Sequence, residues 1–242
     1  MRFRYPLHNQ ILRILQSIDQ SFLSSCETYF GGGTMLVMAY GEHRLSQDID
    51  FLCPYGPAFS RLRNEVYDRG YEAIFRADRD SKISFPREIR ADRDGIRFPI
   101  QMDDLLIKFE IVAEGRIKFN APIQPDWSPV NCLDVVDQVT EKLMANGDRW
   151  ADTSTNSRDL IDLAWLKQAT AFPIAAIEKA EAVYKCVAPL KQSIVKFQSQ
   201  SEYRLQCYEK LQVDSPKTVI DGLDCLAQQF SLAVSDRLVL ET

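Results

Sequence analysis

The sequence contains three Asp-x-Asp pairs with the composition of a metal site: Asp48/Asp50, Asp78/Asp80 and Asp92/Asp94. Only the first has a specific context, because it follows Gly32-Gly33-Thr34 after thirteen residues and precedes an apolar run. Carboxylate and phosphate oxygens are the ligands that Mg²⁺ prefers, and such ions stabilise the entering and leaving oxygens of an in-line displacement. Asp48 and Asp50 are therefore the expected ligands of Mg²⁺ or Mn²⁺ beside a phosphate group, whereas the other two pairs are expected to be solvated loop charges.

The residues around the glycines indicate how a phosphate would be held. Residues 28–30 form a short β-type run, and residues 34–40 have the pattern of a brief helix. A glycine turn between strand and helix lets backbone N–H groups approach a phosphate at the helix N-terminus. We expect Gly32, Gly33 and Thr34 to contact phosphate, with the Thr34 hydroxyl as a cap or a phosphate ligand. The alternative is an ordinary glycine turn beside an unrelated acidic strand.

A third carboxylate is expected on a neighbouring strand. Side chains alternate between the two faces of a strand, so Asp48 and Asp50 point the same way. In the second apolar strand, expected over residues 105–113, Glu110 shares one face with Lys108. We expect Glu110 to complete the metal site or to act as a base. The alternative for Glu110 is a surface acid, and its competitors are two acids expected in a turn, Asp103 and Asp104.

The residues from Gly32 to Phe51 form a constrained pattern, Gly-Gly-Thr-(x)6-Gly-(x)2-Arg-x-Ser-x-Asp-Ile-Asp-Phe. This pattern resembles motif I of the AbiEii/AbiGii-type nucleotidyltransferase toxins, which lie within the polymerase-β-like nucleotidyltransferase superfamily. The resemblance implies that Arg44 and Ser46 help to form a nucleotide site. An arginine suits a triphosphate because its planar fork matches phosphate oxygens. The alternative for Arg44 is a surface charge.

Two later segments resemble further motifs of the same family, VDQVTEKLMANGDRW at residues 136–150 and SRDLIDLAWL at residues 157–166. The resemblance implies nucleotide-binding roles for Lys142, Arg158, Asp159 and Asp162. We expect Lys142 to link two domains by contacting the triphosphate as a point charge. The alternative for Arg158 and Asp162 is a surface ion pair at i, i+4 spacing, worth only about 0.3 kcal/mol. The alternative for Lys142 is a helix-surface residue.

The expected fold class is α+β, with an N-terminal polymerase-β-like nucleotidyltransferase domain of mixed sheet and flanking helices, followed by a C-terminal helical bundle. Periodicity predicts helices at residues 9–26, 34–40, 59–69, 133–145, 157–169, 174–187, 190–211 and 218–233. Alternation predicts strands at residues 28–30, 48–53, 71–75, 96–101 and 105–113, with 116–119 extending the sheet and 76–94 irregular. A proline-spaced connector at residues 121–131 predicts domains at 1–125 and 126–242.

Composition narrows the function classes. Apolar residues make up 45% and charged residues 26%, the balance of a globular protein. Six scattered cysteines without a CxxC pair, and only two histidines, argue against a zinc site or a disulfide framework. The net charge is −5, but residues 1–125 balance 17 basic against 17 acidic side chains, so an RNA-binding surface is expected in that half. No secretion signal or membrane span is visible, so a cytoplasmic location is expected.

Three functions remain open at this stage. The first is a metal-dependent nucleotidyltransferase toxin that transfers a nucleotide from a nucleoside triphosphate to an RNA acceptor such as tRNA, with a possible cognate antitoxin protein. The second is a small-molecule nucleotidyltransferase of the aminoglycoside-modifying kind. The third is a non-catalytic nucleotide-binding module, which Asp48, Asp50, Glu110 and Lys142 argue against.

Overall fold

The structure is a computed structural model that describes residues 2–170 and 172–242. The chain divides into two compact units. The sheet unit contains the residues up to Ala39 together with Gln47–Asp134. The helical unit contains Tyr40–Ser46 together with Val135–Thr242. The chain therefore passes from one unit to the other three times.

The sheet unit contains both helices and strands. Its helices are α1 (Pro6–Gln16), α2 (Gln20–Ser25), α3 (Gly32–Ala39), α4 (Pro57–Arg69) and the 3₁₀ helix η1 (Gly70–Ala73). Its strands are β1 (Tyr29–Gly31), β2 (Ile49–Pro54), β3 (Ile83–Ser84), β4 (Arg90–Ala91), β5 (Gly95–Met102) and β6 (Leu105–Glu114). They form one mixed sheet in the order β1-β2-β6-β5-β3, with β4 also paired to β5.

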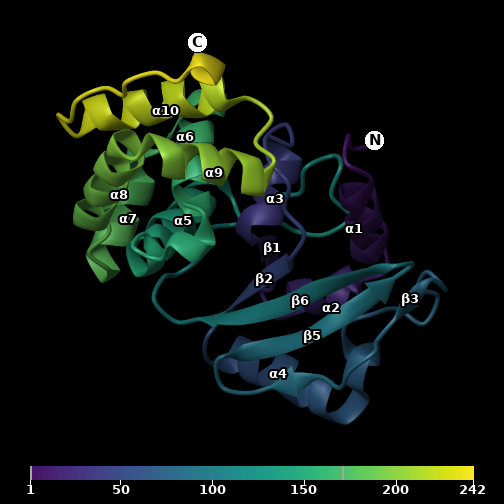
Figure 1. Ribbon diagram of the computed structural model, residues 1–242. Coiled ribbons are helices and arrows are strands. Elements are labelled where there is room, and N and C mark those ends of the chain that lie inside the picture. Colours follow the sequence, from purple (N-terminus) through teal and green to yellow (C-terminus); the bar gives the residue numbers. More distant parts are fainter. Residues whose placement is uncertain (1, 171) are drawn as a thin grey trace. The chain divides into compact units, whose positions relative to one another are not determined.

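The order of the strands brings β2 beside β6. These two strands run parallel, whereas β1 pairs with β2 and β5 pairs with β6 in the antiparallel sense. Figure 1 shows β5 and β6 side by side as long neighbouring arrows. A parallel pair requires a crossover connection, and residues 55–104 supply it. Residues 50 and 110 are therefore neighbours although 60 positions separate them in sequence.

One face of the sheet carries the core of this unit. Alternation buries Ile49, Phe51 and Cys53 completely on this face of β2. Phe51 packs against Phe109 of β6, with ring centroids 5.6 Å apart. The apolar sides of α1 and α4 complete the same buried cluster. The polar residues of β2 and β6 consequently face the opposite way, which is how the expected carboxylates share a face.

The helical unit consists of α5 (Val135–Arg149), η2 (Thr153–Thr155), α6 (Arg158–Ala169), α7 (Ile174–Val183), α8 (Val187–Ser199), α9 (Ser201–Leu211), α10 (Pro216–Gln229) and η3 (Val239–Glu241). Helix α6 packs against both α5 and α10. Figure 1 labels α5 to α10, whose colours run from teal-green to yellow. None of the helices in the described residues is long and apolar enough to span a membrane.

The α+β class with a mixed sheet followed by helices is confirmed. Most expected elements occur within a few residues of their expected bounds, but some differ. The helix expected at 9–26 is two helices, because Asp19 ends the first by capping α2 through the Phe22 amide. The helix expected at 190–211 is likewise divided at Gln200 between α8 and α9.

Two strand predictions were wrong. Residues 71–75 belong mostly to η1, where the apolar side chains of Ala73, Ile74 and Phe75 fill the core without a strand. Residues 116–119 lie outside the sheet, whose strand β6 ends at Glu114. The irregular strand pieces expected within residues 76–94 are present as β3 and β4.

The compact units differ from the expected division after residue 125. Residues 123–133 stay with the sheet unit because Ile123 pairs with Cys132, and β1 exchanges hydrogen bonds with Asn131 and Leu133 through Phe30. The short segment Tyr40–Ser46 joins the helical unit, which no sequence pattern indicated.

The packing of α6 against α10 predicts an intolerant glycine. A Cβ added at Gly222 of α10 would overlap the backbone carbonyl oxygen of Ala164 in α6. We expect Gly222→Ala to lower the free energy of unfolding by about 1–3 kcal/mol, because neither backbone can move without repacking. Lys217→Ala, an exposed change on the same helix, should stay within about 0.5 kcal/mol. Chemical denaturation of both variants measures these changes. Equal free energies of unfolding for Gly222→Ala and Lys217→Ala would contradict a close contact between α6 and α10 at Gly222.

Candidate active site

The turn between β1 and α3 lies directly against the side chain of Asp50. Gly32 has a φ of +70°, and a Cβ at this position would lie 2.6 Å from Oδ2 of Asp50. Both facts require glycine, the first through backbone strain and the second through lack of space. Helix α3 starts at Gly32. The first N–H groups of a helix lack partners within the helix and favour anions. The Asp50 carboxylate lies close to the start of α3, and a phosphate bound there would be favoured for the same reason.

Two of the three expected metal-binding acids, Asp50 and Glu110, lie on one face of the sheet. Asp50 of β2 and Glu110 of β6 are direct neighbours in register, on the face opposite Phe51 and Phe109. Asp48 stands just before the first residue of β2. All three acids are half-buried. The structure thus brings Asp50 and Glu110 together and leaves Asp48 two residues away on the same chain.

Glu110 has cationic partners that sequence analysis did not assign. Its carboxylate accepts hydrogen bonds from Nε of Arg97, on β5, and from Nζ of Lys108, on β6. Burial alone raises the pKa of Glu110, but the hydrogen bonds from Lys108 and Arg97 outweigh it and leave the pKa below its usual range. Glu110 is therefore ionised near neutral pH and is already held by two positive charges.

A single row of residues crosses the sheet at this level. In register order it runs through Gly31, Asp50, Glu110, Arg97 and Arg90. The row begins with the glycine turn, continues with two acids and ends with two arginines. Arginine at the centre of β5 was detectable in sequence as a polar residue between apolar neighbours, but its partner depends on strand order.

The acids suit a hard divalent cation shared with a phosphate. Among the described residues no group of three or more His, Cys, Asp or Glu side chains is arranged as a ready-made metal cage. Mg²⁺ is commonly held by one or two carboxylates together with substrate phosphates and water. Asp48 and Asp50, next to the start of α3, match that smaller requirement.

The other residues of the glycine motif occupy different environments. Gly33 is half-buried beside Gly32, whereas Thr34 is 1% exposed within the first turn of α3. The Thr34 side chain therefore does not face open solvent in this structure. Ser46 is half-buried and belongs to the helical unit with Arg44.

Arg44 and Lys142 meet on Asp162 inside the helical unit. Asp162 has no exposed surface, and its two oxygens accept from Nε and Nη2 of Arg44 at 2.6 and 2.7 Å. Nζ of Lys142 lies 2.7 Å from the same carboxylate, and Nε2 of His43 lies 3.0 Å away. Burial raises the pKa of Asp162, but the charges of Arg44 and Lys142 outweigh it and hold the pKa well below its usual range.

Asp159 extends this buried network by one turn of α6. Its carboxylate accepts from Lys142 at 3.0 Å and from Nε and Nη2 of Arg149 at 2.6 and 3.0 Å. Lys142 thus bridges two aspartates, and any phosphate that binds it must compete with both. Arg158 is half-buried at the first position of α6. The alternative of a surface pair between Arg158 and Asp162 is wrong for Asp162, because that side chain is fully buried.

The segment Tyr40–Ser46 is attached to α6 and α9 by further contacts. The ring of His43 stacks on Trp165, with centroids 4.8 Å apart. The indole N–H of Trp165 donates to the carbonyl of Tyr40, and the amide of Leu45 donates to the carbonyl of Leu211. Arg44 is 3% exposed, so the alternative of a surface charge is also wrong. These contacts explain why the segment belongs to the helical unit.

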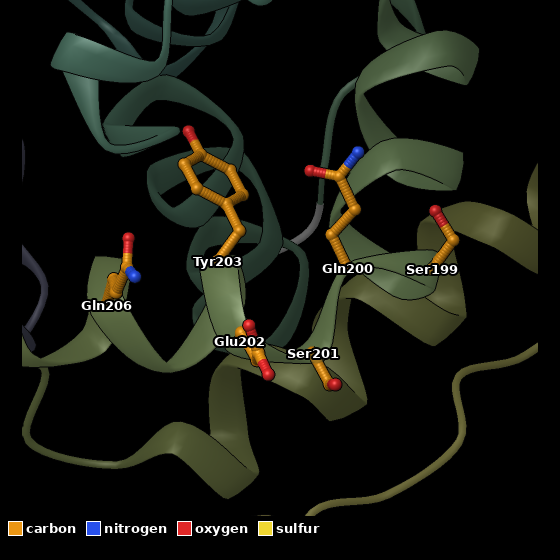
Figure 2. Close-up of a pocket in the computed structure, with 6 residues that line it drawn as sticks. All are labelled: Ser199, Gln200, Ser201, Glu202, Tyr203 and Gln206. Atoms are coloured by element: carbon orange, nitrogen blue, oxygen red, sulfur yellow. The ribbon is translucent and has the colours of Figure 1, made fainter.

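A polar pocket lies elsewhere in the helical unit, where α8 meets α9. It has a volume of about 460 Å³ and is lined by Ser199, Gln200, Ser201, Glu202, Tyr203 and Gln206. Figure 2 shows the side chains of Gln200 and Tyr203 extending in the same direction from the backbone. None of the residues expected to do chemistry lines it, and we assign it no role.

The mixed sheet, the glycine turn and the acids beside it define a nucleotidyltransferase-type α+β protein. The family described as "Nucleotidyl transferase AbiEii toxin, Type IV TA system" matches residues 13–206. The chain belongs to this family of nucleotidyltransferase toxins, as the glycine and aspartate motif predicted. No curated protein matches the sequence.

Two solved structures from Helicobacter pylori are similar to this chain. JHP933 has a TM-score of 0.51 and 18% sequence identity over 94% of this chain and 93% of its own. A putative nucleotidyltransferase has a TM-score of 0.49 and 19% identity over 92% of each chain. At this identity the first match supports the shared fold alone.

The buried network predicts a strong dependence of stability on Asp162. Asp162→Asn should lower the free energy of unfolding of the helical unit by about 3–5 kcal/mol, because it leaves buried Arg44 without its carboxylate partner and removes one of the two aspartates that hold Lys142. Asp221 lies on α10 of the same unit, and its partly exposed carboxylate pairs with Arg237. Asp221→Asn removes this charge and should lower the free energy of unfolding by less than about 1 kcal/mol. Urea denaturation followed by circular dichroism measures both. Equal losses in the two variants would contradict a buried network.

Proposed function

We propose that this protein is a metal-dependent nucleotidyltransferase that transfers a nucleotide from a nucleoside triphosphate to an RNA acceptor, with tRNA the favoured class. One observation carries the proposal. The backbone at Gly32 lies so close to the Asp50 carboxylate that a Cβ at Gly32 would overlap it. Glu110 is the neighbour of Asp50 in the strand register. Helix start, carboxylates and cations therefore adjoin, as phosphate chemistry requires.

The roles of the individual residues follow from their positions. We assign Mg²⁺ or Mn²⁺ to Asp48 and Asp50, with Glu110 as third ligand or base, and the ion would lower the cost of charge that develops on the reacting phosphate. Gly32 and Gly33 offer backbone N–H groups to phosphate. Thr34 supports the turn from within, since its side chain is buried.

The remaining assigned residues are proposed to act through the helical unit. Arg44, Lys142, Asp159 and Asp162 form one buried network. We propose nucleotide binding as the role of this network and of Ser46 and Arg158, which lie near it in sequence. Any direct phosphate contact of Lys142 would require its displacement from an aspartate. Lys142 is 6% exposed, which makes such displacement costly.

The acceptor is proposed from the family and from charge. The family is one of toxins in toxin–antitoxin systems, so a cognate antitoxin is an expected genetic partner. RNA is a polyanion, and its binding is dominated by phosphate contacts with basic side chains. Arg97, Lys108 and Arg90 supply such side chains on the sheet beside the proposed metal site.

We predict that Asp50→Asn abolishes nucleotide transfer, lowering the rate by at least about 100-fold, while the protein remains folded. The substitution removes a metal-ligand charge from a half-buried position without changing shape. The measurement is incorporation of label from each of the four nucleoside triphosphates into total RNA, with Mg²⁺ or with excess EDTA. The matched control is Asp78→Asn, because Asp78 belongs to another Asp-x-Asp pair and is an exposed residue whose partner is Arg76.

Wild-type and Asp78→Asn proteins should both label RNA with Mg²⁺ present and neither should do so in EDTA. A folded Asp50→Asn protein with undiminished transfer would refute the assignment of the metal site. Transfer to a small molecule in place of RNA would refute the acceptor and leave the metal site standing.

A further inference from the structure

Glu110 lies beneath the two cations that hold it. The Glu110 side chain is 13% exposed, whereas those of Arg97 and Lys108 are 32% and 53% exposed. An anion that arrives from solvent therefore meets the cations before it meets the acid. This layering differs from a surface ion pair, in which both partners are usually open to water.

Arg97 has a second anchor that would keep it in place without Glu110. Its Nη1 donates to the two oxygens of Asp92 at 3.3 and 3.4 Å, while its Nε serves Glu110. Asp92 is itself fixed, because it accepts from the amides of Asp94 and Gly95. Loss of the Glu110 contact would therefore free one edge of the guanidinium and leave its direction unchanged.

We propose that Arg97 and Lys108 form a phosphate-binding pair that Glu110 occupies in the free protein and that a substrate phosphate takes over. The proposal rests on the function proposed above, in which Glu110 turns to the metal site beside Asp50. Arg97 and Lys108 then exchange the Glu110 carboxylate for a phosphate oxyanion, so one anion replaces another, while Arg97 keeps its contact with Asp92. The ligand chemistry is a phosphate oxyanion, from the donor triphosphate or from the backbone of the acceptor RNA.

If Glu110 competes with phosphate for these cations, its removal should strengthen phosphate binding, which a purely structural ion pair would not do. Glu110→Gln removes the occupying charge, so it should increase the affinity for inorganic tripolyphosphate without metal by about tenfold, as expected for one charge-assisted contact. Arg97→Gln should decrease the same affinity by about tenfold, and the double variant should behave like Arg97→Gln. Lys108→Gln should act in the same direction as Arg97→Gln, and it provides a second variant on a more exposed side chain.

The test is calorimetric titration of the full chain with tripolyphosphate in EDTA. Arg69→Gln is the matched control, because Arg69 is 52% exposed on α4, which packs against the core face of the sheet. Arg69→Gln lowers the net charge by one, as Arg97→Gln and Lys108→Gln do, so its affinity for tripolyphosphate measures the general electrostatic effect for those two variants. Thermal unfolding by circular dichroism establishes that each variant is folded.

A second arm identifies the source of the phosphate. Binding of tRNA is measured against salt concentration, since each lost phosphate contact lowers the slope of log affinity against log salt by about one. A weaker tripolyphosphate affinity with an unchanged slope assigns the pair to the donor, and a lower slope assigns it to the acceptor.

The proposal is overturned if folded Arg97→Gln and Lys108→Gln match Arg69→Gln in both arms. It is also overturned if Glu110→Gln does not bind tripolyphosphate more tightly than wild type. The function proposed above is tested separately by transfer of label, so a protein that binds tripolyphosphate as expected but transfers no nucleotide would refute the enzyme and support the phosphate pair.

Discussion

The site depends on the close approach of the Gly32 backbone to the Asp50 carboxylate. This approach needs three things together: a residue without a Cβ, a positive φ at the start of α3, and a strand that points Asp50 away from the core. The core supplies the third, because Ile49 and Phe51 are completely buried on the other face. Packing on one face therefore fixes the chemistry that is possible on the opposite face.

A second constraint acts on the chain that joins α3 to β2. Residues 40–46 leave the sheet unit and are held in the helical unit by Arg44, His43 and Asp162. Burial lowers the pKa of His43, so its ring stays neutral against Trp165 near neutral pH. Asp48 follows this segment by two residues. The motif that reads as continuous in sequence thus serves two units, with its ends in the sheet unit and its middle in the helical unit.

Local patterns were sufficient to predict the glycine turn, the strand of Asp50 and the strand of Glu110. Each depends on alternation or on glycine, which act over a few residues. The partners of Glu110 were not predictable, because Arg97 reaches it only through the pairing of β5 with β6. The same holds for Lys142, whose two aspartates lie 17 and 20 positions further along the chain on α6. The sequence pattern suggested that the Lys142 ammonium would be available to a phosphate, whereas in the fold Asp159 and Asp162 neutralise it.

Fold and family membership agree with these local predictions, whereas two of the regular elements expected from the sequence differ in the structure. Asp19 divides one expected helix by accepting from the Phe22 amide. Residues 71–75 resemble a strand by composition but bury their apolar side chains from a 3₁₀ turn instead. In the second case tertiary packing selected between conformations that the local sequence permits.

The most direct test of the account is binding of Mn²⁺, followed by electron paramagnetic resonance, in the presence of a non-hydrolysable triphosphate analogue. We expect a bound Mn²⁺ signal in the wild-type protein that requires the analogue and disappears in folded Asp50→Asn. Gly32→Ala should also weaken this signal, since its Cβ would stand 2.6 Å from Oδ2 of Asp50. An equal Mn²⁺ signal in wild type and folded Asp50→Asn would contradict the central claim that Asp50 and the glycine turn form a shared metal and phosphate site.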